Sequence, residues 1–189
     1  MTLNKDKFST FISKVRSTPL NFQFQFIELS SFIVTQMVDL FNNENKYEQI
    51  KTVVFASFFC DISLKDSIQI GYRTEDSISC LWVEADKKLI MEHAYRAAKI
   101  VSQYKEAPPL AYEIVKQHHG AIDGKSLPTI FSEDLLPLSK CLIAAQELAY
   151  EILKKPKIPV VDIVSYVTNK YIGTPLFAPL EAFKNFCRK

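Results

Sequence analysis

The hydrophobic positions of this chain recur mainly three and four residues apart, which is the spacing of one face of an α-helix. The first apolar stripe consists of Phe8, Phe11, Ile12 and Val15. The second stripe consists of Phe22, Phe26, Leu29, Ile33, Met37 and Leu40. Both patterns predict helices that turn one face toward a core.

The same spacing predicts helices along most of the remaining chain. The expected ranges are 47–62, 86–104, 110–119, 133–153 and 160–171, followed by a short helix that ends near Cys187. Residues 62–84 show no clear periodicity and are assigned to neither a helix nor a loop. We therefore expect an all-α fold, a bundle of seven or eight helices, in a single domain that spans residues 1–189.

Charge and cysteine usage exclude several classes of protein. The 23 basic and 21 acidic residues leave a net charge of +2, so we expect neither a nucleic acid nor a membrane as partner. The four cysteines, at positions 60, 80, 141 and 187, are widely spaced and form no C-x-x-C pair. With no continuous apolar leader or 18-residue apolar run, we expect a reducing, cytoplasmic location.

The residues that could carry chemistry are few. The chain has three histidines, His93, His118 and His119, and each falls at or beside the apolar face of an expected helix. Asp61 follows the apolar run of the helix 47–62. Because a buried imidazole must lose its charge or find a partner, a site shared with Asp61 would explain this placement. Carboxylate and imidazole ligands suit one divalent transition metal, namely Fe, Mn, Zn or Ni.

A purely structural explanation remains open from spacing alone. His93 would then bond a backbone carbonyl of the core, and His118 and His119 would cap the last carbonyls of their helix. Asp61 would cap a neighbouring helix. Two other polar residues, Asp123 and Lys65, lie near these positions in the sequence without a defined role.

Five segments, in the right order, resemble the HD-GYP branch of the HD phosphohydrolase superfamily. Residues 58–63 (FFCDIS) are similar to the apolar run into H-D-I-G-K, and residues 92–100 (EHAYRAAKI) to the H-P-x-x-G-x-x-I-L helix. The most specific match is 114–128 (IVKQHHGAIDGKSLP), which resembles I-x-x-H-H-E-x-x-D-G-x-G-Y-P. Residues 138–146 (LSKCLIAAQ) and 172–179 (IGTPLFAP) resemble two later helical elements, so the resemblance covers most of the chain from about residue 20.

The resemblance implies an HD-domain helical bundle that hydrolyses cyclic di-GMP, a bacterial second messenger, at two or three metal ions. Asp61, His93, His118 and His119 match metal ligands of the family, so these four are the predicted metal ligands. Three other ligand positions are altered: no histidine occurs near residues 26–28, Cys60 replaces the His of H-D, and Gln146 replaces a late Asp. Cys60 remains an alternative thiolate ligand, although an apolar setting makes a thiol inert.

We therefore expect a catalytically inactive signalling or regulatory module that binds a protein partner or a cyclic dinucleotide. The alternative is a weak phosphodiesterase with one metal, because a single ion supplies only part of the two-metal chemistry. A structural role for the histidines also remains open. The N-terminal helix, Asn4 to Arg16, belongs to residues 1–19, outside the strong resemblance, and would pack on the bundle or mediate self-association.

Overall fold

The computed structural model describes residues 5–17, 21–41, 45–128 and 130–188, and in these ranges it contains helices and no strands. The all-α prediction is confirmed. The helices are α1 (Lys5–Ser17), α2 (Phe22–Leu40), α3 (Lys46–Phe59), the 3-10 helix η1 (Ser67–Gly71), α4 (Glu75–Ser79), α5 (Glu84–Met91), α6 (His93–Ser102), α7 (Ala111–Gln117), α8 (Pro137–Lys154), α9 (Val160–Lys170) and α10 (Phe177–Arg188).

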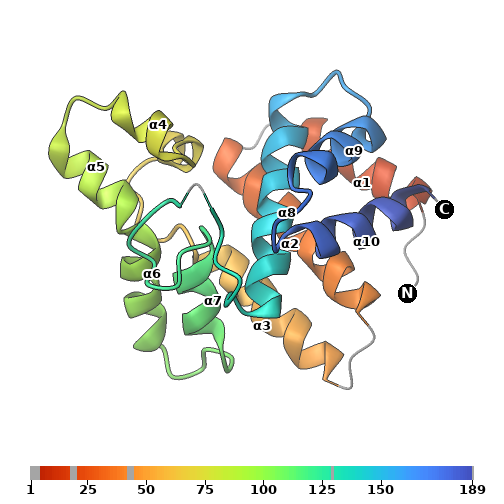
Figure 1. Ribbon diagram of the computed structural model, residues 1–189. Helices are drawn as coiled ribbons and strands as arrows, with labels where there is room; N and C mark the ends of the chain where they lie inside the picture. The colour runs from red at the N-terminus through yellow and green to blue at the C-terminus, as the bar shows by residue number, and fades with distance from the viewer. Residues whose placement is uncertain (1–4, 18–20, 42–44, 129, 189) are drawn as a thin grey trace.

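Helices α2 and α8 pack against each other at the centre of the core. Figure 1 shows α8 with α1, α2, α9 and α10 around it, and α4 to α6 on the opposite side of the molecule. Pro137 begins α8, where its missing N–H costs nothing and its fixed φ suits a helix. The largest fully buried side chains include Phe26 and Phe183, and the same core reaches α6 and α7 through Ala97 and Ile114.

Helix α1 packs on the bundle, which was one of the two roles expected for the N-terminal helix. Phe11 stacks on Phe32 of α2 with ring centroids 4.1 Å apart. Arg16 donates from Nη2 to the carbonyls of Ile152 and Lys155, at 2.9 and 3.2 Å, and so satisfies the end of α8. The expected start at Asn4 and the side chain of Phe8 lie outside the described residues.

The helix expected over 86–104 is interrupted at Glu92, between α5 and α6. A continuous helix would pair the Tyr95 N–H with the carbonyl four residues earlier, but this N–H instead donates to the Gly124 carbonyl at 3.0 Å. His93 and Ala97 of α6 are buried. Farther along, helical spacing from His93 would place Ile100 and Tyr104 on the same inward face, but both are exposed and Val101 is buried instead.

The unassigned segment 62–84 contains two short helices with side-chain caps. Asp66 caps η1 and Thr74 caps α4, each in a reciprocal capping box. Trp82, in the same segment, is 100% exposed. The functional consequence of this segment is the placement of Arg73, which lies between the two capped helices and points to the body of the molecule.

None of the helices in the described ranges combines the length and apolar character needed to cross a membrane.

Candidate metal centre

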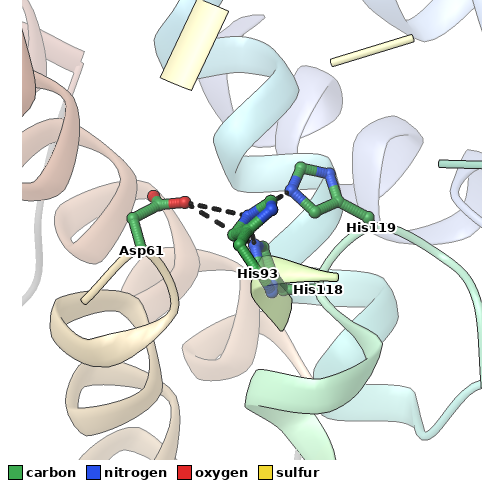
Figure 2. Close-up of side chains that lie close together, drawn as sticks. All are labelled: Asp61, His93, His118 and His119. Carbon is green, nitrogen blue, oxygen red and sulfur yellow. Dashed lines mark hydrogen bonds and ion pairs between the residues drawn. The ribbon is translucent and has the colours of Figure 1, made fainter. Parts of the chain in front are cut away.

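The four predicted metal ligands meet in the interior, delivered by three separate elements. Asp61 lies in the turn after α3, His93 begins α6, and His118 and His119 follow α7. One potential ligand atom from each residue lies within 4.8 Å of those of the others. Figure 2 shows Asp61 on one side and His119 on the other, with His93 and His118 between them.

Two backbone carbonyls fix the orientation of the central imidazoles. Nδ1 of His93 lies 2.5 Å from the Ile90 carbonyl, and Nδ1 of His118 lies 2.7 Å from the Val115 carbonyl. A carbonyl oxygen only accepts hydrogen bonds, so both Nδ1 atoms must carry the proton. The neutral rings therefore present the lone pair of Nε2 to the centre of the cluster, as metal-bound histidines do.

Four of the distances between ligand atoms are close to those in a small coordination sphere, and all of them are within 4.8 Å. Nε2 of His93 lies 3.1 Å from Nε2 of His118, 2.9 Å from Nε2 of His119 and 3.3 Å from Oδ1 of Asp61. The distance from His118 Nε2 to the same oxygen is 3.7 Å. Ligand atoms at typical zinc distances in a tetrahedron lie about 3.3 Å apart. The cluster could therefore hold a metal ion.

The pKa values of the cluster residues favour the protonation states that bind a cation. Burial alone raises the pKa of Asp61, but His118 and His93, when either ring also carries a proton on Nε2, outweigh it through hydrogen bonds and charge and hold that pKa well below its usual value. Burial lowers the pKa of His118, and burial with the charges of His118 and His93 lowers the pKa of His119 further. An ionised carboxylate and neutral imidazoles are the forms that bind metal.

The structural explanation left open by the sequence describes part of the same geometry. His93 does bond a carbonyl, and His118 does satisfy a carbonyl in the last turn of α7. These bonds use only Nδ1 and leave Nε2 for the centre. The remaining candidates lie outside the cluster: Lys65 is exposed, and exposed Asp123 accepts a bond from the Lys125 N–H in a turn.

Two of the three altered ligand positions also meet, directly beside the cluster. Gln146 donates from Nε2 to Sγ of Cys60 at 3.2 Å, and both side chains are buried. Burial, followed by the charge of Asp61, raises the pKa of the Cys60 thiol well above its usual value. A thiol that stays protonated is a poor metal ligand. Cys60 and Gln146 therefore add no anionic donor to the four residues of the cluster.

A cavity of about 480 Å³ opens beside the cluster, with His118 and His119 on its wall. Its wall also carries an ion-pair network that sequence reasoning missed. Arg73 Nε bonds Oε1 of Glu147 at 3.0 Å, while Lys170 Nζ lies 3.5 Å from Oε2 of Glu147 and the Tyr171 hydroxyl donates to that oxygen at 2.5 Å. Arg73 and Glu147 are 74 positions apart, so no local pattern indicated the pair.

Comparisons with known proteins add no assignment to this geometry: no family model matches the chain, and neither does any curated protein or solved structure.

Proposed function

We propose that this chain is a degenerate HD-GYP-like module that binds one divalent transition metal at Asp61, His93, His118 and His119 and acts in regulation by binding a ligand or protein without cleaving it. The observation that supports the metal site is that the lone pairs of the histidine Nε2 atoms and of the Asp61 carboxylate point at one another. With both Nδ1 protons given to carbonyls, the Nε2 atoms of His93 and His118 face each other at 3.1 Å beside a carboxylate. A bound cation relieves this repulsion.

The lack of hydrolysis follows from the neighbouring residues. Attack on a phosphodiester at neutral pH commonly uses two metals that hold the attacking and leaving oxygens. The space directly beside the four residues is occupied by a neutral thiol and a neutral amide, those of Cys60 and Gln146. These groups supply no charge for a second ion. Fe, Mn, Zn and Ni all remain compatible with the N and O donors present.

The metal proposal is tested by elemental analysis of protein purified without chelator. We expect about one transition-metal ion per chain in the wild type and a loss of that metal in Asp61→Asn and in His118→Ala/His119→Ala. Asp123→Asn is the matched control, because this carboxylate sits in an exposed turn outside the cluster. Metal-free wild type after gentle purification would count against the proposal.

A second candidate is a weak metal-dependent phosphohydrolase acting on cyclic di-GMP or a related phosphoester. The observation that favours it is the cavity, which reaches His118 and His119 and would give a substrate access to a bound ion. Incubation of the metal-loaded protein with cyclic di-GMP separates the two candidates. Turnover that His118→Ala abolishes would establish the hydrolase, whereas binding without turnover supports the regulatory module.

A further inference from the structure

Arg73 is an unusually placed cation. Its side chain is only 10% exposed, yet it lines the cavity that also reaches His118 and His119. The guanidinium is held in position by Nε, which bonds Glu147, and by the rings of Phe26 and Tyr150, whose centroids lie 5.5 and 5.6 Å from its Cζ. These contacts fix its orientation before any ligand arrives.

Most of the hydrogen-bonding capacity of Arg73 is unused. A guanidinium has five N–H donors, and in the part of the chain that the structure describes only Nε–H has an acceptor. The four N–H groups on Nη1 and Nη2 have none. These groups are not fully buried and Arg73 lines the cavity, so they are available to a ligand that binds there.

The charges around Arg73 favour an anion as that ligand. The carboxylate of Glu147 is shared by two cations, Arg73 and Lys170, so these three groups together carry one positive charge, while the exposed Asp76 and Lys154 elsewhere on the wall offset each other. The other partly buried carboxylate of the wall, Glu151, is already paired with Lys155 at 2.6 Å. Burial alone lowers the pKa of Arg73, but Glu147 and Asp61 raise it, so the guanidinium stays charged.

We infer that the cavity binds an oxyanion, a phosphate or carboxylate group, through a forked pair of hydrogen bonds from Arg73. The fork of the guanidinium matches two oxygens of either group, which an ammonium cannot reproduce. This anion would be the ligand of the proposed regulatory module. Its regulatory role rests on the proposed function, whereas its binding by the guanidinium does not. A ligand anchored in this way reaches into the cavity beside the metal cluster.

Isothermal titration calorimetry with inorganic phosphate and with acetate tests the inference, with the metal content of the same preparation recorded. We expect saturable binding of at least one anion by the wild type, and a loss of about tenfold or more in affinity in Arg73→Lys, because the bidentate pair is lost. Tighter binding of phosphate identifies a phosphate-bearing ligand, and tighter binding of acetate identifies a carboxylate. Lys154→Met, which removes an exposed cation from the same cavity, is the matched control.

Arg73→Lys retains a positive charge beside Glu147 and is expected to fold. If it loses cooperative unfolding, the paired variant Arg73→Met/Glu147→Met removes both charges together, and the same loss of binding is expected. Failure of the wild type to bind either anion, or equal affinity in a folded Arg73 variant, overturns the inference. The metal content of the preparation distinguishes the two proposals. If the protein contains metal but its anion binding does not depend on Arg73, only the anion site is ruled out. If anion binding depends on Arg73 but the protein contains no metal, only the metal site is ruled out.

Discussion

Gln146 donates a hydrogen bond to the sulfur of Cys60, 86 positions away in the sequence. The Oε1 atom of Gln146 is buried and receives no hydrogen bond from the described residues. The pair lies directly beside Asp61, whose Oδ2 is 3.5 Å from the same sulfur. A thiol is a weak acceptor, so this bond compensates poorly for the burial of an amide. The pair therefore fills the space beside the four-residue cluster but lowers the free energy of unfolding.

The first prediction concerns that cost. Gln146→Met removes the unpaired Oε1 while filling a similar volume, and we expect it to raise the free energy of unfolding by about 1 kcal/mol. Chemical denaturation followed by circular dichroism measures the change. The matched control is Gln117→Met, because buried Gln117 accepts a bond from the Leu136 N–H at 3.0 Å. That variant is expected to lose stability, and a loss of similar size in both would contradict the explanation.

The grouping of Asp61, His93, His118 and His119 was predicted from the sequence because each residue is marked by its type and its local position. His118 and His119 end a short amphipathic helix, and Asp61 follows an apolar one, so helical spacing alone places them near the core. Their convergence was supported by the order of motifs in the resemblance. The structure brings one potential ligand atom of each residue within 4.8 Å of the others, so the cluster could hold a metal ion.

The features that the sequence did not predict depend on long-range contacts. Arg73 comes from a segment with weak periodicity, and its partner Glu147 lies on a helix whose pattern indicates only a buried face. The interruption at Glu92 arises because the Tyr95 N–H bonds Gly124, 29 positions later in the chain, rather than the preceding turn. Helical propensity near Glu92 gives no sign of this bond, because tertiary contacts override local preference.

The second prediction concerns the stability that a bound metal provides. A ligand that binds only the folded state stabilises it by about 4 kcal/mol at a concentration 1,000 times its Kd. We therefore expect a chelator to lower the melting temperature of the wild type and to have little effect on His93→Ala. Calorimetry with and without chelator measures the difference. A His93→Ala protein that is less stable but keeps its full metal content would instead assign His93 a structural role.

The third prediction concerns the acid side of the stability profile. Burial alone raises the pKa of Glu147, but Arg73, Tyr171 and Lys170 hold it below the usual value of 4.5. As pH falls, the unfolded chain takes up this proton before the folded one, so the stabilisation is present above pH 4.5 and is lost as pH falls through the folded value. Denaturant titrations between neutral pH and pH 3 should show this loss in the wild type. In Glu147→Gln the free energy of unfolding should fall less steeply with decreasing pH below 4.5, because the titrating carboxylate is missing.

The fourth prediction concerns Gly124, which links the loop after the histidines to the start of α6. Its φ is +67°, its carbonyl accepts the Tyr95 N–H, and an added Cβ would lie 2.7 Å from the Lys116 carbonyl and 3.1 Å from the Tyr95 nitrogen. Gly124→Ala therefore combines backbone strain with a clash against backbone atoms, and we expect a loss of about 2–4 kcal/mol in the free energy of unfolding.

Gly173 provides the matched control for that variant. Its φ is also positive, at +79°, but an added Cβ meets no atom within 4 Å. Gly173→Ala should therefore lose only the conformational cost of about 1–2 kcal/mol and keep its metal. Because Gly124 fixes His93 relative to His118 through the Tyr95 bond, Gly124→Ala should also weaken metal binding in titrations of folded protein. Equal effects of the two substitutions on stability and on metal affinity would show that the loop does not position the cluster.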